Sequence, residues 1–170
     1  MPRPPGNVAL RMGKPIVDLA TLDLSKHVVS DEELRRCLPQ RDTFQLLDGI
    51  VHLDVPNNVA VGYKDWDENP WWGEAHVPGR PLFPGVLMIE GGAQIATFLV
   101  KQQIGWTSDE LIGLAGIDGV RVRGQVTPPA RVYFVSSIEK ISGRRLARMN
   151  AQVFCDDVMV MEMQVMGAML

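Results

Sequence analysis

Cysteine is scarce in this sequence, and neither sign of charge dominates it. The chain has two cysteines, Cys37 and Cys155, among 170 residues, too few for a disulfide framework and without metal-ligand spacing. A reducing compartment, the cytoplasm, is therefore the simplest expectation. The 17 basic and 20 acidic residues leave a net charge of −3, which argues against the basic surface that non-specific nucleic-acid binding requires.

Long apolar runs are also missing. The most apolar region, Leu82–Val100, is interrupted by Pro84, Glu90 and Gln94. No run approaches the roughly 18 apolar residues that span a bilayer. The first 15 residues contain no apolar core of a secretory signal. We therefore expect a soluble protein without a membrane partner.

The length suits one domain. Residues 1–15 are rich in Pro, Gly and basic side chains and are expected to form an extended or mobile arm. We place an N-terminal extension at 1–29 and a single domain at 30–170. In "VVSDEELRRCLP", Ser30 and Glu33 fit a capping box and predict a short helix.

A long apolar helix is predicted to follow two strands. Residues 44–54 and 58–66 read as strands joined by the turn "VPNN". The helix is expected at 85–104, with Pro84 at its start and Gly105 just past its end. Because so few of its residues are charged, a sheet must wrap around it.

Four further strands are predicted after the helix, at 111–126, 130–141, 145–155 and 158–169. The short turns "TPPA", "SGRR" and "CDDV" between them indicate an antiparallel meander. In the last strand a stripe at period two is expected to face the core: Met159, Met161, Met163 and Val165. The predicted fold class is α+β.

The stretch "GEAHVPGRPLFPGVLMIEGGAQ" carries the candidate chemistry. The first N–H groups of the helix, at Gly85 and Val86, can bind an anion or a carbonyl oxygen that becomes negative. Glu90 follows an apolar run, and a desolvated carboxyl group holds its proton, as a general acid must. Gln94, four residues on, can hydrogen-bond Glu90. His76, held between prolines, is a candidate base.

Plainer interpretations remain open for the same residues. A histidine in a loop is commonly just exposed, and a helical glutamate commonly forms a structural hydrogen bond. A zinc site from His52, His76 and Glu90 is conceivable but matches no motif. The adjacent Gly91 and Gly92 weaken the helix and predict close approach of another backbone, from the wrapped sheet or from a partner subunit.

The segment "HVPGRPLFPGVLMIEGGAQ" resembles the signature of bacterial 3-hydroxyacyl-(acyl-carrier-protein) dehydratases, including the fourteen-residue step from His76 to Glu90. "LPQRDTFQLLDGI" and "GIDGVRVRGQVTPPARVYFVSSIEKI" are similar to the family's first strand and post-helix strands. The resemblance covers about residues 30–170. It implies a hotdog fold, in which an antiparallel sheet wraps a long helix.

The resemblance also implies an activity, partners and roles. The substrate is a 3-hydroxyacyl group on the phosphopantetheine arm of an acyl-carrier protein. His76 removes the C2 proton, Glu90 protonates the leaving hydroxyl and Gln94 orients Glu90, while Gly85 and Val86 bind the thioester. No metal or organic cofactor is implied. The family forms a homodimer with shared active sites, and these dimers can assemble as a trimer of dimers.

The sequence departs from the family pattern at four places. Ala75 precedes His76 where glycine is usual, and "NPWWGEAH" is one residue longer than usual. Gln40 stands where a histidine is common, and Gly91-Gly92 replaces a bulkier pair. These changes leave open an altered substrate, a weak activity or a paralogue without activity.

Two alternatives to the dehydratase therefore stand: a hotdog acyl-thioesterase, and a non-catalytic acyl-thioester-binding paralogue. Dehydration leaves the thioester intact, whereas a thioesterase releases a free thiol. An acidic carrier protein would suit a local basic face. Candidates are Arg121 and Arg123, two apart on a predicted strand, and the Arg144-Arg145 turn, although ordinary solvated arginines explain each equally well.

Overall fold

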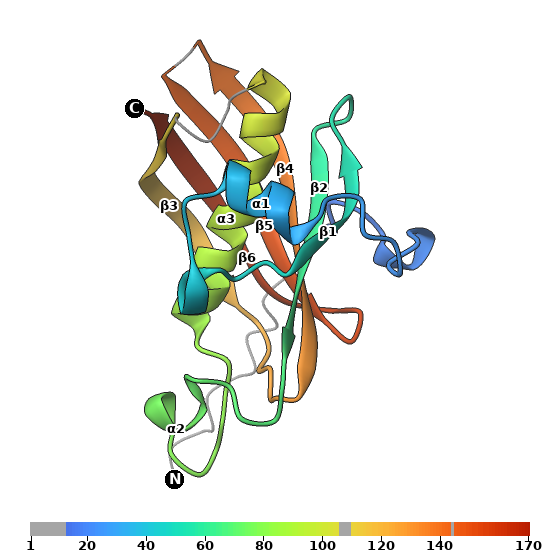
Figure 1. Cartoon of the computed structure of the whole chain (residues 1–170), viewed down its shortest axis with the longest axis vertical. Helices are drawn as coiled ribbons and strands as arrows, with labels where there is room; N and C mark the ends of the chain where they lie inside the picture. The colour runs from blue at the N-terminus through green and yellow to red at the C-terminus, as the bar shows by residue number, and fades with distance from the viewer. Residues whose placement is uncertain (1–12, 106–109, 144) are drawn as a thin grey trace, which may run out of the picture.

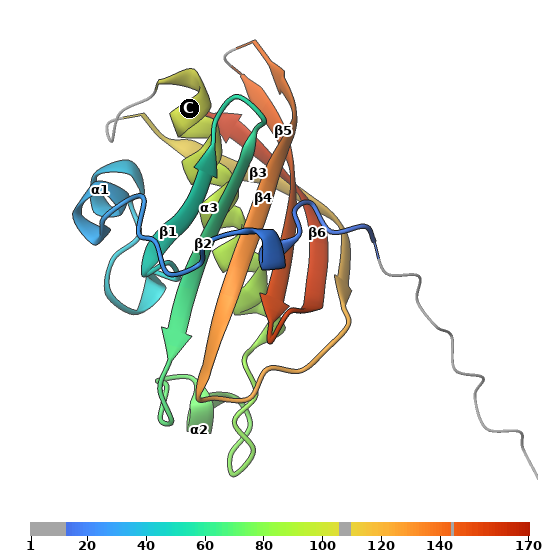
Figure 2. The ribbon, with the colours of Figure 1, turned by 90° about the vertical axis from the view of Figure 1, so that its right-hand side faces the viewer.

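The computed structural model describes residues 13–105, 110–143 and 145–170. Its centre is the helix α3 (Gly85–Ile104), around which one antiparallel sheet is wrapped (Figures 1 and 2). The sheet has six strands in the order β1-β2-β4-β5-β6-β3. They are β1 (Gly49–Asp54), β2 (Val59–Trp66), β3 (Ile112–Val122), β4 (Ala130–Ser142), β5 (Leu146–Cys155) and β6 (Val158–Met169). This is the hotdog arrangement, so the predicted α+β fold is confirmed.

The helices α1 (Asp31–Cys37) and α3 begin and end where local signals place them. α1 has the predicted capping box between Ser30 and Glu33. α3 occupies the predicted residues and ends at Gly105, whose φ of 67° is the left-handed conformation that glycine adopts readily. Three-residue 3-10 turns lie at Leu19–Thr21 and Asp42–Phe44. Within the described residues, no helix is long and apolar enough to cross a membrane.

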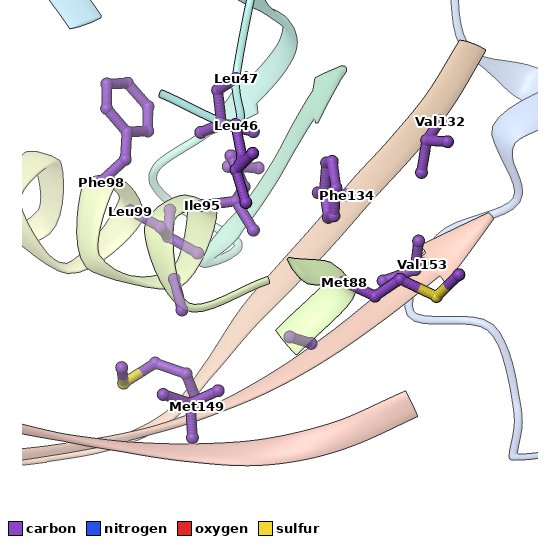
Figure 3. Close-up of a cluster of buried hydrophobic side chains, with 14 of the residues drawn as sticks. Leu46, Leu47, Met88, Ile95, Phe98, Leu99, Val132, Phe134, Met149 and Val153 are labelled. Carbon is purple, nitrogen blue, oxygen red and sulfur yellow. The ribbon is translucent and has the colours of Figure 1, made fainter. Parts of the chain in front are cut away.

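The core lies between α3 and the inner face of the sheet. Figure 3 shows Ile95, Phe98 and Leu99 of the helix beside Leu46 and Leu47, with Phe134 of β4 and Met149 of β5 on the sheet side; all seven are buried. These side chains fix α3 against the sheet. The polar groups of the helix that face another way are therefore held in defined positions.

Gly91 and Gly92 are the points where the sheet comes closest to α3. A Cβ atom at Gly91 would lie 2.4 Å from the ring of Phe134. One at Gly92 would lie 2.5 Å from the terminal methyl of Met163 and 3.3 Å from Ala151 Cβ. The predicted close approach is therefore real, but sheet side chains make it, where we expected another backbone.

The first strand is shorter than predicted. It begins at Gly49, not at residue 44, because the preceding backbone is engaged by a side chain of α3. Leu46 N donates to Gln94 Oε1 (3.0 Å), and Phe44 O accepts from Gln94 Nε2 (2.7 Å). Backbone groups used in this way cannot join a strand ladder.

The four later strands do not form a simple meander, so that prediction was wrong for β3. β4, β5 and β6 pair in sequence, but β4 has β2 on its other side. β3 therefore pairs with β6 at the far edge of the sheet. The segment containing "TPPA" is a crossing connection, and Arg123 N and Gly124 N donate to Val160 O along it (2.7 and 3.2 Å).

The methionine stripe of β6 is confirmed except at Met159. Met161, Met163 and Val165 belong to the core beside α3, whereas Met159 belongs to a second apolar cluster on the outer face of the sheet. A register shift between Val153 and Phe154 of β5 places an extra residue in β6. One extra residue reverses the side-chain direction of everything beyond it.

The N-terminal segment covers that second cluster. It crosses the outer face of the sheet (Figure 2) and packs with Ile16, Val17, Leu19, Leu22 and Leu24. The buried Gln152 of β5 fixes it, since Ile16 N donates to Gln152 Oε1 (2.8 Å) and Gln152 Nε2 donates to Lys14 O (2.9 Å). Most of the mobile arm expected at 1–15 lies outside the described residues.

Candidate functional site

The start of α3 presents free backbone donors. Pro84 is the N-cap, and its carbonyl accepts from Leu87 N (3.0 Å) and Met88 N (3.1 Å). The N–H groups of Gly85 and Val86 precede those donors and have no acceptor within the helix. Val86 is 70% exposed, and a Cβ atom at Gly85 would be in ordinary contact, 3.5 Å from Val122 Cγ2. An oxygen can approach this end of the helix.

Gln94 holds Glu90 as predicted. Gln94 is 1% exposed, and its Nε2 donates to Glu90 Oε1 over 2.8 Å. The same amide group is fixed from the other side by the backbone of Phe44 and Leu46. The amide nitrogen thus uses both hydrogens, and the half-buried Glu90 carboxyl group receives a donor of fixed direction.

Glu90 opens onto a small cavity of about 80 Å³ between α3 and the β3–β6 edge of the sheet. One wall carries the polar side chains of Gln40, Glu90, Gln94 and Thr97. The opposite wall is mostly apolar and includes Ile112, Leu114, Met149 and Val165. A carboxyl group placed here faces both an apolar wall, as predicted, and a polar one.

His76 lies elsewhere, at the end of the short helix α2 (Gly73–His76), which falls in a stretch where we predicted no helix. Figure 1 shows α2 beyond the N-terminal end of α3. His76 is exposed, and its Nδ1 is 2.9 Å from Leu82 O. A carbonyl oxygen only accepts, so Nδ1 carries the proton of the neutral ring and Nε2 keeps a free lone pair. In this tautomer, Nε2 is the nitrogen that can accept a proton.

An aromatic cluster that the sequence reading missed anchors α2. Trp72, the N-cap of α2, is 1% exposed and meets Trp66 edge to face at 5.4 Å between ring centroids. Phe83 packs on both tryptophans, at 5.2 and 5.4 Å. The available signal was the pair of tryptophans in "NPWWGEAH", because large aromatic rings dominate burial wherever they cluster.

The turn from His76 to α3 is tied down at two further points. Both Glu74 carboxylate oxygens lie 3.3 Å from Gly79 N, and Gly79 has a φ of 70°. Arg80 donates to Gln125 Oε1 (3.2 Å). The position of His76 is therefore set by contacts on both sides of the turn.

A single chain does not bring the two candidate catalytic groups together. His76 is not among the residues that line the Glu90 cavity. A larger hollow of about 470 Å³ lies on the outer face of the sheet, beside Lys14 and Ile16, and is lined by neither group. We favour the smaller cavity as the site because it contains Glu90 and the bound amide of Gln94.

The two candidate arginines of β3 have different surroundings. Arg123 lies just past the strand and is 7% exposed by its side chain, in an ion pair with Glu162, so the prediction of a shared basic face was wrong. Arg121 is exposed. Arg145 is also exposed, whereas Arg144 lies outside the described residues.

Both cysteines are free thiols; Cys37 is buried and Cys155 is half-buried. Burial raises the pKa of the Cys37 thiol, and burial followed by Asp156 raises that of Cys155. Both therefore stay protonated near neutral pH, away from Glu90. In the described part of the chain, no three His, Cys, Asp or Glu side chains are grouped to hold a metal ion.

The chain is similar in sequence to a family of known proteins. The sequence profile of the FabA-like domain matches residues 38–164. The chain is 34% identical to the 3-hydroxyacyl-[acyl-carrier-protein] dehydratase FabZ of Saccharophagus degradans over 139 residues, which is 80% of this chain and 94% of that protein. It is also 34% identical to the FabZ of Allorhizobium ampelinum, covering 81% of this chain and 87% of that protein.

A solved structure adds support for the fold alone. A chain of the dehydratase heterocomplex ApeI:P from Xenorhabdus doucetiae superposes with a TM-score of 0.65 and 13% sequence identity, over 81% of this chain and 90% of that chain. At this identity the likeness concerns architecture.

Proposed function

Because this chain belongs to the FabA-like family, we propose that it is a hydro-lyase that converts 3-hydroxyacyl thioesters on acyl-carrier protein to trans-2-enoyl thioesters in fatty-acid biosynthesis. The observation that carries the proposal is the Glu90 carboxyl group, fixed by Gln94 at the wall of a cavity. A general acid requires a group held in this way.

The proposed reaction needs only this chain's groups and the substrate. His76 Nε2 takes the C2 proton, and the electron pair of the broken C–H bond forms the C2=C3 double bond. The thioester oxygen carries the charge that develops, and the Gly85 and Val86 N–H groups stabilise it. Glu90 gives its proton to the C3 hydroxyl as the C3–O bond breaks, and water leaves.

We further propose that two copies build each site, with His76 from one protomer and Glu90 from its partner. β3 is an edge strand, and its exposed apolar side chains include Leu114, Val120 and Val122. Val86, at the start of α3, is exposed as well. An edge strand offers unpaired backbone groups to a second copy. Measuring the mass of the protein in solution tests this: a dimer gives two copies, and a trimer of dimers gives six.

The carrier protein is proposed to dock beside the His76 turn. Arg80 is an exposed cation of that turn, whereas the exposed Arg121 lines the hollow on the outer face of the sheet. An acidic partner suits the exposed cation of the turn. We place the protein in the cytoplasm, in keeping with its free Cys37 and Cys155.

The test is hydration of a short trans-2-enoyl thioester, followed by its ultraviolet absorbance. Wild type is expected to be active, and His76→Ala and Glu90→Gln are each expected to lose about 10²-fold or more. Mixing the two inactive variants by refolding should restore about a quarter of wild-type activity, because half of the dimers then hold one intact site.

Each opposite result has a defined meaning. Folded wild type without turnover contradicts the dehydratase. Release of free thiol instead indicates a thioesterase. If the two inactive variants form mixed dimers but regain no activity, sites shared between protomers are contradicted.

A further inference from the structure

Gln40 occupies a distinctive place at the Glu90 cavity. It lies in the irregular segment after α1 and lines the same polar wall as Glu90 and Thr97. Its Oε1 atom is buried, and no hydrogen-bond donor reaches it from the described residues. A buried amide oxygen without a donor is costly, because it has given up its hydrogen bonds to water. A ligand that enters the Glu90 cavity and donates a hydrogen bond to Gln40 Oε1 would supply the missing partner.

A second, smaller cavity lies behind Gln40. It measures about 10 Å³ and is shared with Gln45 and Gln94. Gln45 Oε1 is also buried without a donor from the described residues. A space of this size holds at most about one water. The Gln40 amide therefore stands between a water-sized space and the Glu90 cavity, and contributes a polar surface to the larger one.

From Glu90, the cavity extends along α3 toward the C-terminal end of the helix. Thr97 is seven residues beyond Glu90, which corresponds to about 10 Å of helix. An engineered cavity of about 150 Å³ holds benzene, so the 80 Å³ found here accommodates about three or four carbon-sized atoms. If Glu90 protonates the C3 hydroxyl, the carbons after C3 extend into this space.

We propose that Gln40 is a specificity-determining residue, which selects short acyl chains that end in a hydrogen-bonding group such as a hydroxyl. This rests on the proposed function. The chain's middle carbons contact the apolar wall of Ile112 and Met149, and its polar end meets the Gln40 amide. A plain alkyl chain leaves that amide without a partner. Sites built to hydrogen-bond a ligand reject analogues that lack the group far more strongly than they reject one methylene.

The test compares two pantetheine thioesters of equal chain size, trans-2-hexenoyl and 5-hydroxy-trans-2-pentenoyl. We expect wild type to hydrate the hydroxyl-ended chain with a kcat/KM at least about 10-fold higher. Gln40→Met, of similar size but apolar, should lose that preference. Gln103→Met, at an exposed position of α3, should keep it. Equal turnover of both chains by wild type, or a preference that survives in Gln40→Met, would overturn the proposal.

Binding separates this inference from the proposed function. If neither thioester is turned over, the dehydratase fails, yet the pocket can still be measured. Calorimetry with the matching saturated chains, made as stable amides in place of thioesters, should show the same 10-fold or larger difference in Kd for wild type and none for Gln40→Met. Equal Kd values for wild type would refute the role of Gln40.

Discussion

Gln94 donates a hydrogen bond of 2.8 Å to Glu90 from the next turn of α3. The same Gln94 amide binds Leu46 N and Phe44 O, which lie 48 and 50 residues earlier in the chain. Through this side chain, the direction of one carboxyl group depends on a segment far away in sequence. Removing the amide should therefore affect both the fold and the site.

We expect Gln94→Leu to lower the free energy of unfolding by about 2–3 kcal/mol, because buried backbone groups lose their partners. It should also lower kcat by about 10-fold, since a misplaced acid transfers its proton poorly. Urea unfolding and enoyl-thioester hydration measure the two effects. Gln103→Leu, exposed on the same helix, should change neither. Full activity in folded Gln94→Leu would contradict the positioning role.

Gly91→Ala and Gly92→Ala are expected to differ, although both improve helix propensity by about 1 kcal/mol. The new methyl at residue 91 meets the rigid ring of Phe134 at 2.4 Å, whereas at residue 92 it meets the flexible end of Met163. We expect Gly91→Ala to lose about 1–3 kcal/mol of stability and Gly92→Ala less than about 1 kcal/mol.

Urea unfolding checks this difference, and adding Phe134→Leu to Gly91→Ala should recover part of the loss. Equal stability of the two alanine variants would show that the ring of Phe134 moves aside as readily as the terminal methyl of Met163.

The sequence predicted α3 well because its signals are local. Pro84, Gly105 and the apolar run between them suffice to place both ends of the helix. The order of the strands could not be predicted in this way, because strand pairing depends on contacts between segments that are distant in the sequence. Nothing near β3 indicates that β6 is its neighbour, and the extra residue that turns Met159 outward lies in β6, where it faces the step from Val153 to Phe154 of β5.

Contacts within one segment of the site could be predicted from the sequence, but the way its separate segments come together could not. The four-residue spacing of Glu90 and Gln94 predicts their hydrogen bond, since such residues share a helix face. The aromatic anchor of α2 joins Trp66, Trp72 and Phe83 from three segments, so no single motif reveals it. Likewise, the fourteen-residue spacing of His76 and Glu90 in the sequence does not reveal that the two side chains lie apart within one chain.

Asp65 and Arg131 offer a test by pH. Hydrogen bonds from Arg131 hold the pKa of the Asp65 carboxyl group below its usual range. A lowered folded-state pKa adds stability above the unfolded value near 3.9, and this stability is lost as the pH falls through the folded value. Because both side chains are about half exposed, we expect Asp65→Asn to cost no more than about 1 kcal/mol at pH 7.

Urea unfolding of wild type and Asp65→Asn across pH 2–7 would reveal the dependence. The difference between them should shrink below about pH 4. A difference that is constant down to pH 2 would mean that the ion pair does not account for it.

The neighbouring tryptophans Trp71 and Trp72 give the sharpest test of how His76 is held. Trp72 is buried against Trp66 and Phe83, whereas Trp71 is 50% exposed. We expect Trp72→Ala to lose about 3–5 kcal/mol of stability, and Trp71→Ala less than about 1 kcal/mol. Because α2 starts at Trp72, the milder Trp72→Phe should stay folded yet reduce kcat, as His76 shifts from its position. Urea unfolding and enoyl-thioester hydration of the three variants check this. Wild-type kcat in Trp72→Phe, together with lost stability, would assign the aromatic cluster to the fold alone.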